Sequence, residues 1–253
     1  MKPAYRLDGP EDAAVLVLSP SLGTTTRFWE GVLPAFASRF RVLRHDLPGH
    51  GESPVPDGPV RVEDIAHGVL AVLDELGVEH ASFCGVSIGG MVGQWLGANA
   101  PERLAGLALC CTGAKLGERA DFYARAELVR REGTAAIVEG ARERWFTAAF
   151  RDAPEARRIL DELAAISAEG YAACAEAVGE WDFRAELHRI GLRPLVLFGE
   201  EDPVTPPAVR ETLLDGIPGA RPAFVARAAH LANVEQPEAF AAAVLSYLEK
   251  GAG

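Results

Sequence analysis

The chain has 253 residues, of which 49% are hydrophobic and 24% are charged, and such values are typical of a globular protein with a substantial core. Its 25 basic and 36 acidic residues give a net charge of −11. This excess argues against nucleic acid or an anionic membrane as the main partner, because both favour clustered Lys and Arg. No segment approaches the roughly 18 apolar residues of a membrane span, and the N-terminal apolar run AAVLVL is too short for a signal peptide. We therefore expect a cytoplasmic protein.

Short apolar runs recur along the chain and predict strands buried on both faces of a mostly parallel sheet. They lie at 14–19, 41–46, 81–86, 104–111, 194–199 and 220–226. Amphipathic patterns between these runs predict helices at 28–39, 62–77, 91–100, 207–216 and 237–250. Regular alternation of strand and helix predicts a doubly wound α/β sheet with right-handed crossovers and helices on both faces.

The alternation stops between about Gly113 and Glu180, where helical segments such as EARRILDELAAIS occur without a convincing strand. This break predicts a helical cap, residues 113–180, inserted into a single core formed by residues 1–112 and 181–253. The four cysteines have no CxxC or framework spacing. The chain also lacks a glycine-rich phosphate loop and a cluster of metal-ligating residues, so the sequence predicts no metal and no cofactor.

A serine, Ser87, lies in the segment GVSIGG between the strand predicted at 81–86 and the helix that follows. The segment matches the G-x-S-x-G elbow, in which a tight turn raises a serine hydroxyl above the carboxyl edge of a sheet. Such a turn strains the serine backbone, so its neighbours must lack bulk, and Gly85, Gly89 and Gly90 meet this requirement. The N-terminus of the following helix also directs free N–H groups toward the serine. Ser87 is therefore the candidate nucleophile.

A serine nucleophile needs a base, and the base needs a carboxylate that orients it. In folds with this elbow the acid and then the base follow the serine along the chain. Asp202 follows the strand predicted at 194–199 and precedes a proline, and His230 follows the last predicted strand. Glu200 and Glu201 are weaker candidates, because the Asp-Pro turn favours the shorter carboxylate as the fixed one. The other histidines are interpreted as surface, core or turn residues: His45, His50, His67, His80 and His188.

The oxyanion that forms when a serine attacks a carbonyl needs two preorganised backbone donors. One is the N–H of the residue after the nucleophile, Ile88. The other is expected in the loop SPSLGTTTRFW, which follows the first long strand, and Leu22 directly before Gly23 is the best candidate. A plain glycine-containing turn is the alternative interpretation of this loop.

With these residues located, the chain resembles 3-oxoadipate enol-lactonases of the α/β-hydrolase superfamily over nearly its whole length. The similar segments are SLGTTTRFW, RVLRHDLPGHGES, GVSIGGMVGQWLG, ERWFTAAFR, EGYAACAEAV and AAHLANVEQPEAF. The elbow is shared by many hydrolases, whereas SLGTT, RWFT and HLANVEQPEAF are more particular to lactonases. The resemblance implies an α/β-hydrolase fold and the opening of an enol lactone to 3-oxoadipate, a step of aromatic catabolism in the β-ketoadipate pathway.

The substrate that this resemblance implies is a small anionic lactone, whose free carboxylate needs local positive charge. Residues 113–158 hold ten basic and eight acidic side chains, a local charge of +2 in an acidic protein. Arg144 is the first candidate for binding the carboxylate, because a guanidinium can hold it through two hydrogen bonds. Trp145 could form a wall beside the lactone ring, and Lys115 is a second candidate. The alternative is that Arg144 is solvated and Trp145 belongs to the core of the cap.

Two other functions share these sequence features. Small-ester carboxylesterases and cofactor-free perhydrolases use the same triad, so the triad does not determine the substrate. A non-catalytic ligand receptor can also retain a hydrolase triad. The sequence does not determine the oligomeric state, and a homo-oligomer is possible.

Overall fold

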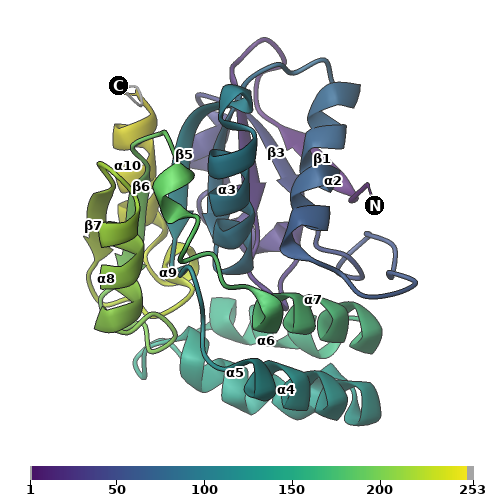
Figure 1. Cartoon of the computed structure of the whole chain (residues 1–253). Coiled ribbons are helices and arrows are strands. Elements are labelled where there is room, and N and C mark those ends of the chain that lie inside the picture. The colour runs from purple at the N-terminus through teal and green to yellow at the C-terminus, as the bar shows by residue number, and fades with distance from the viewer. Residues whose placement is uncertain (1, 250–253) are drawn as a thin grey trace.

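A seven-stranded sheet runs through the computed structural model, which describes residues 2–249 (Figure 1). Its strands are, in spatial order, β1 (Tyr5–Asp8), β3 (Arg41–His45), β2 (Val15–Ser19), β4 (Ala81–Val86), β5 (Leu104–Cys110), β6 (Leu195–Gly199) and β7 (Arg221–Val225). β1 pairs with β3 in the antiparallel sense, and the other neighbouring pairs are parallel. The predicted mostly parallel sheet is therefore confirmed, with each predicted strand correct to within one residue at either end.

The central strands β2, β4 and β6 are buried at every position, which explains their continuous apolar sequences. The edge strand β1 was not predicted, because its sequence YRLD alternates apolar and charged residues over only four positions. Both of its charged residues have partners, and Arg6 pairs with Glu52 in the turn after β3 at 2.7 Å. Arg44 of β3 donates hydrogen bonds of 2.7 and 2.9 Å to the carboxylate of Asp8.

Helices cover both faces of the sheet (Figure 1). The helices of the core are α1 (Leu33–Ala37), α2 (Val62–Glu75), α3 (Ile88–Asn99), α8 (Pro207–Gly216), α9 (Ala232–Glu235) and α10 (Pro237–Glu249). Short 3-10 helices are η1 (Thr26–Trp29), η2 (Pro101–Arg103), η3 (Thr134–Ile137) and η4 (Leu187–Arg189). α2 and α3 pack together on one face, and α1 packs with α10 on the other.

Two helix predictions need correction. The helix predicted at 28–39 was wrong in its extent, because the structure divides this segment into η1 and the short helix α1. Gly31 lies between them, and Pro34 near the start of α1 lacks the N–H that a continuous helix requires. Helix α3 begins at Ile88 and not at Met91, since the turn at Ser87 leads straight into it.

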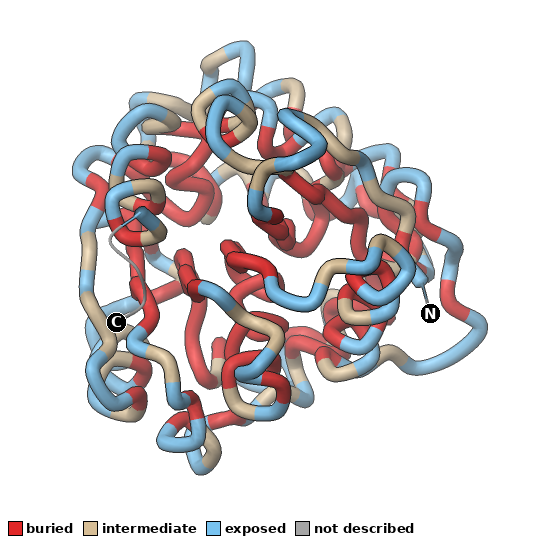
Figure 2. Tube along the Cα trace, turned by 90° about the horizontal axis from the view of Figure 1, so that it is seen from above, coloured by how far each residue is buried: buried red, intermediate tan, exposed pale blue. Residues whose placement is uncertain are grey.

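Helices α4 (Arg119–Glu132), α5 (Val138–Trp145), α6 (Pro154–Ala164) and α7 (Ala168–Glu180) lie between β5 and β6 along the chain, in the segment in which the sequence predicts a cap. They form a separate layer across the end of the sheet at which β5 leads into α4 (Figure 1). α4 and α7 pack against each other. Buried residues gather in the interior, whereas exposed residues follow the outer turns (Figure 2). Among residues 2–249, no helix has the length and apolar sequence needed to cross a bilayer.

Candidate active site

Ser87 occupies a strained turn between β4 and α3, with φ of 58° and ψ of −119°. A residue other than glycine rarely adopts such a conformation, which costs about 1–3 kcal/mol. The surrounding glycines allow the turn to form. A Cβ atom at Gly85 would lie 2.1 Å from the carbonyl oxygen of Gly89, and one at Gly89 would lie 2.1 Å from that of Ser19. At Gly90 it would lie 2.6 Å from the side chain of Thr112.

Asp202 and His230 meet at the carboxyl ends of β6 and β7. The Nδ1 atom of His230 lies 3.0 Å from Oδ2 of Asp202, and both side chains are almost completely buried. The Asp202 carboxylate also accepts hydrogen bonds from the Thr205 hydroxyl at 2.6 Å and the Val204 N–H at 2.8 Å. Burial acts to raise the pKa of Asp202, but the charge and hydrogen bond of His230, with those two donors, outweigh it and lower the pKa. An ionised Asp202 therefore accepts a hydrogen bond from the Nδ1–H group of His230 and leaves Nε2 able to act as a base.

Ser87 lies at the same edge of the sheet, because β4, β5, β6 and β7 are neighbouring parallel strands. Its N–H donates to the carbonyl of Cys110 at 3.0 Å, and its carbonyl accepts from the Thr112 hydroxyl at 2.8 Å. In the described part of the chain no hydrogen bond joins the Ser87 hydroxyl to the His230 ring. Catalytic hydrogen bonds of this kind are often long until a substrate is bound.

The backbone N–H groups of Leu22 and Ile88 are buried donors without a protein acceptor. Leu22 is 7% exposed and Ile88 is completely buried. Within residues 2–249 neither N–H donates a hydrogen bond, although buried backbone donors almost always have a partner. Two free backbone donors are what an oxyanion requires.

The other acids and histidines considered in the sequence have different surroundings. Glu200 and Glu201 are exposed, unlike the buried Asp202, and His67, His80 and His188 are exposed as well. His45 and His50 are buried and hydrogen-bonded. His45 binds the Ser19 hydroxyl at 2.9 Å. His50 binds the carbonyl of Pro48 at 2.9 Å.

We expect the two buried histidines to make the protein sensitive to mild acid. Burial lowers the pKa of both His45 and His50 to about 4, against an ordinary value of 6.5. Below pH 6.5 these histidines bind protons in the unfolded chain but not in the folded chain. Their contribution to the free energy of unfolding is therefore fully present above pH 6.5 and is lost as the pH falls towards 4. Between pH 6.5 and 5 each histidine should lower the free energy of unfolding by about 2 kcal/mol.

Denaturant unfolding at pH 7 and pH 5 measures this loss, and the variant His50→Gln is the comparison. Burial raises the pKa of Asp46 and Glu235, and these carboxyls act in the opposite sense. The difference between the wild-type and variant losses isolates His50, because both proteins retain the carboxyls. A loss of stability equal in the two proteins would contradict a role for His50.

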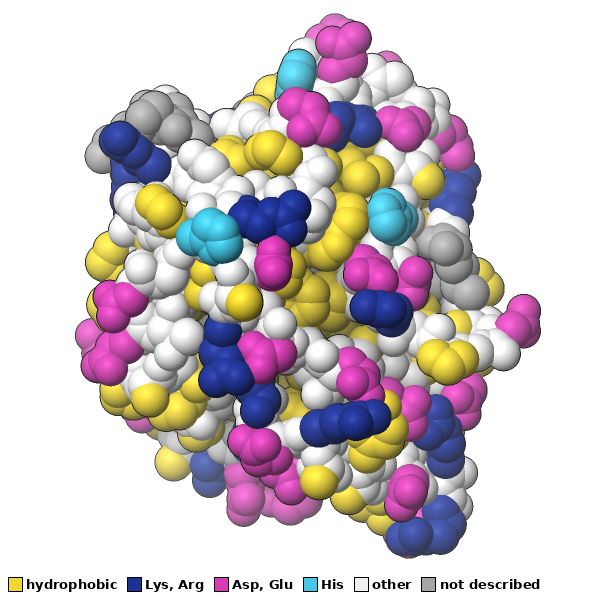
Figure 3. Space-filling view, in the orientation of Figure 1, with side chains coloured by type: hydrophobic (Ala, Val, Ile, Leu, Met, Phe, Trp, Pro, Cys, Tyr) yellow, Lys and Arg dark blue, Asp and Glu magenta, His cyan; other side chains and the backbone are white. Residues whose placement is uncertain are grey.

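Two arginines, Arg125 and Arg144, lie close enough to Tyr171 to act on its hydroxyl. Burial and the charge of Arg125 in α4 lower the pKa of Arg144 in α5. Burial raises the pKa of the Tyr171 hydroxyl, and the charge and hydrogen bond of Arg125 and the charge of Arg144 oppose that rise. In residues 2–249 neither arginine forms an ion pair with a carboxylate. The face that carries α2 and α3 shows side chains of both signs of charge interspersed (Figure 3).

Aromatic rings at the end of α5 and in α7 lie against Gly23, next to Leu22. A methyl group at Gly23 would come within 3.2 Å of the rings of both Trp145 and Tyr171. Trp145 is buried here, and its backbone carbonyl accepts a hydrogen bond of 3.1 Å from the N–H of Leu231, next to His230. Lys115, the second sequence candidate, pairs instead with exposed Glu118 at 3.5 Å.

The sequence did not predict Arg125 as a candidate site residue. It belongs to the positively charged segment 113–158, but no spacing rule indicates that it meets Arg144, which lies on another helix. The sequence also did not indicate Glu235, whose buried carboxylate accepts hydrogen bonds from the N–H groups of Ala229 at 2.8 Å and Thr147 at 3.1 Å. Glu235 therefore ties the loop that carries His230 to the end of α5.

The model of the Alpha/beta hydrolase family matches residues 15–243. The chain therefore belongs to the α/β-hydrolase family, and the predicted fold is confirmed. The resemblance to 3-oxoadipate enol-lactonases is also confirmed. The chain is 41% identical to 3-oxoadipate enol-lactonase 2 of Acinetobacter baylyi, over 97% of this chain and 92% of that protein.

Solved structures agree with this relationship. The enol-lactonase from Burkholderia xenovorans LB400 superposes with a TM-score of 0.94 and 37% identity, covering 97% of this chain and 96% of that one. A thermophilic esterase from Thermogutta terrifontis gives a TM-score of 0.91 and 30% identity, covering 98% of this chain and 93% of that one.

Proposed function

We propose that the protein hydrolyses 3-oxoadipate enol-lactone to 3-oxoadipate, in the β-ketoadipate pathway, through a triad of Ser87, His230 and Asp202. The enol-lactonases among its relatives support the substrate. The observation that carries the choice of a lactone with a free carboxylate is the group of Arg125, Arg144 and Tyr171. Tyr171 lies beside Gly23, and the two arginines that act on its pKa have no carboxylate partner among residues 2–249.

In the proposed reaction, His230 takes the proton of the Ser87 hydroxyl as its oxygen bonds to the lactone carbonyl carbon. The N–H groups of Leu22 and Ile88 bind the negative oxygen, and one such donor contributes about 3 kcal/mol. Collapse of the adduct breaks the ring C–O bond, and the enolate that leaves receives the proton from His230.

The leaving group stays tethered to the acyl group, so ring closure would be intramolecular and fast. Conversion of the enol to the ketone removes that nucleophile and makes opening effectively irreversible. A water molecule then gives a proton to His230 and attacks the acyl carbon. Ser87 recovers its proton as 3-oxoadipate leaves.

Turnover of purified enol lactone, compared with a neutral aryl acetate, tests the proposal. We expect a larger kcat/KM for the lactone. A preference for the neutral ester would indicate a carboxylesterase, for which the similarity to the Thermogutta terrifontis esterase is the supporting observation. Negligible turnover of any ester, with tight ligand binding, would indicate a receptor.

We expect Arg144→Ala to raise KM for the enol lactone by about 10- to 100-fold, since a hydrogen-bonded charge of this kind contributes roughly 1.5–3 kcal/mol. Turnover of the neutral aryl acetate should stay unchanged, and Arg125→Ala should act in the same direction. Arg142→Ala is the matched control, because Arg142 lies on the same helix but pairs with Glu139 and Asp152. Equal losses on both substrates would show that Arg144 acts through packing.

A further inference from the structure

The turn between β3 and α2, residues 46–53, packs against the loop that carries Leu22. We call residues 20–26 the oxyanion loop. The N–H of Gly23 in this loop donates a hydrogen bond of 3.1 Å to Nε2 of His50. His50 is completely buried, and its ring stacks on Tyr171 with a centroid distance of 6.4 Å. The turn therefore holds the oxyanion loop in place through the hydrogen bond between His50 and Gly23.

The hydrogen bonds of His50 define its protonation state. Because the Gly23 N–H must donate, Nε2 is the acceptor and carries no proton. The proton of the neutral ring then lies on Nδ1, which donates to the carbonyl of Pro48 at 2.9 Å. A doubly protonated ring would leave the Gly23 N–H without an acceptor.

The peptide planes on both sides of Leu22 are held in this way. On one side, the carbonyl of Ser21 accepts hydrogen bonds from the N–H of Thr24 at 3.2 Å and from its hydroxyl at 2.8 Å. A trans peptide directs the carbonyl and the N–H in opposite senses. The Leu22 N–H therefore points away from that turn. On the other side, His50 fixes the peptide that joins Leu22 to Gly23.

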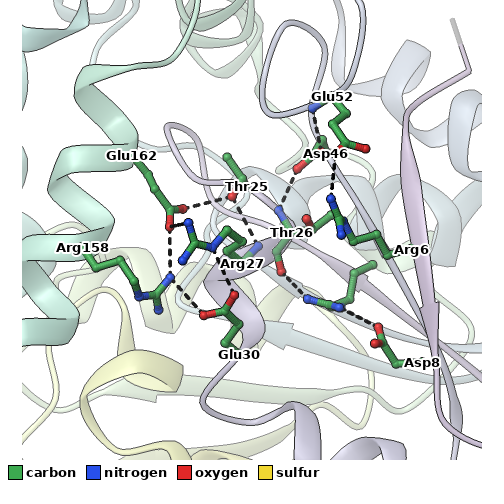
Figure 4. Close-up of polar contacts among 11 residues, drawn as sticks. Arg6, Asp8, Thr25, Thr26, Arg27, Glu30, Asp46, Glu52, Arg158 and Glu162 are labelled. Atoms are coloured by element: carbon green, nitrogen blue, oxygen red, sulfur yellow. Dashed lines mark hydrogen bonds and ion pairs between the residues drawn. The ribbon is translucent and has the colours of Figure 1, made fainter.

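A side chain at position 23 could not take over this role. The φ of Gly23 is +83°, and a Cβ atom there would lie 2.8 Å from the side chain of Leu163 in the cap, so a larger residue cannot stiffen the loop. Further along, Oδ1 of Asp46 accepts the N–H of Thr26 at 2.7 Å, and Glu162 accepts the Thr25 hydroxyl at 3.0 Å (Figure 4). These contacts anchor the end of the loop, whereas His50 anchors its middle.

We propose that His50 is a positioning residue that fixes the oxyanion loop through the Gly23 N–H and so holds the Leu22 N–H in its catalytic orientation. The proposal rests on the oxyanion role proposed above for Leu22. It assigns to His50 no contact with the substrate and no proton transfer. Its contribution is to the transition state, because negative charge on the carbonyl oxygen develops there and is absent in the bound substrate.

Two variants test this role. His50→Leu removes the acceptor, whereas His50→Gln retains an amide oxygen that can accept from Gly23. Misplacement of a catalytic donor by about 1 Å can lower the rate roughly 100-fold. We expect His50→Leu to lower kcat about 10- to 100-fold with KM changed less than about threefold, and His50→Gln to recover most of the loss. His45→Leu is the control for loss of a buried histidine, and its kcat should stay within about twofold of the wild type.

Ligand binding separates positioning from packing. An alkyl boronic acid adds to a catalytic serine and directs one oxygen at the oxyanion donors, whereas the product 3-oxoadipate needs no such stabilisation. For His50→Leu, boronate affinity should fall in step with kcat, and product affinity should stay constant. Equal losses of kcat and product affinity, or unchanged boronate affinity, would overturn the proposal.

The wild-type protein provides a test that needs no variant. Nitrogen NMR of ¹⁵N-labelled histidine should show His50 at pH 7 as a neutral ring protonated on Nδ1. A proton on Nε2 would overturn the proposal. All rates are measured with both the enol lactone and the neutral aryl acetate. If only the acetate is turned over, the proposed substrate is wrong, while the kcat of the His50 variants on the acetate still decides the role of His50.

Discussion

Replacement of Ser87 by Ala should lower kcat for the enol lactone by about 10⁴- to 10⁶-fold, as removal of the nucleophile does in other serine hydrolases. The side chain of Ser87 makes no hydrogen bond within the described residues, so its loss should leave the free energy of unfolding within about 1 kcal/mol of the wild type. Steady-state kinetics and denaturant unfolding measure the two effects. Near-normal turnover would remove Ser87 from the mechanism.

Two further substitutions sharpen this result. Ser87→Gly should be as inactive as Ser87→Ala but more stable by about 1 kcal/mol, because glycine relieves the strain of φ 58°. Ser82→Ala, at a buried serine of the same strand, should keep its kcat within about twofold of the wild type. Loss of activity at Ser82 would show that the assay responds to damage in β4.

Replacement of Asp202 by Asn should lower kcat by about 10⁴-fold, as in proteases that use the same triad. The amide oxygen can keep the hydrogen bond from Val204, but the NH₂ group then faces Thr205 and His230. This NH₂ group donates to Nδ1 of His230, which moves the ring proton to Nε2 and leaves no base for Ser87.

Glu201→Gln is the control for Asp202→Asn, because Glu201 is the adjacent carboxylate but is exposed. Its kcat should stay within about twofold of the wild type. Circular dichroism should show both variants folded. If Glu201→Gln were the inactive variant, the acid of the triad would have to be reassigned.

The sheet and the elbow could be predicted because their signals are local. The strand 81–86 has a continuous apolar sequence, since both of its faces are covered. Ser87 and Asp202 each follow such a strand, and His230 follows the half-exposed edge strand β7. Parallel strands bring their carboxyl ends to one edge of a sheet. Neither inference required knowledge of how the cap packs.

The features that sequence reasoning missed depend on contacts between distant segments. β1 has charged residues at two of its four positions, and its place at the edge of the sheet accounts for them. The role of Arg125 could not be predicted, because it depends on the proximity of Arg144, which lies on another helix. His50 was interpreted as a turn residue, which is correct, but its bond to Gly23 joins two loops that no periodicity connects.

Labelling of Ser87 with a fluorophosphonate tests the nucleophile most directly. The serine oxygen displaces fluoride and forms a stable phosphonate ester, which intact-mass and peptide mass spectrometry locate. The expected result is one label per chain, on Ser87, with loss of enol-lactone hydrolysis in proportion to the labelled fraction. Full hydrolysis of the lactone by protein that is completely labelled on Ser87 would contradict the proposed mechanism.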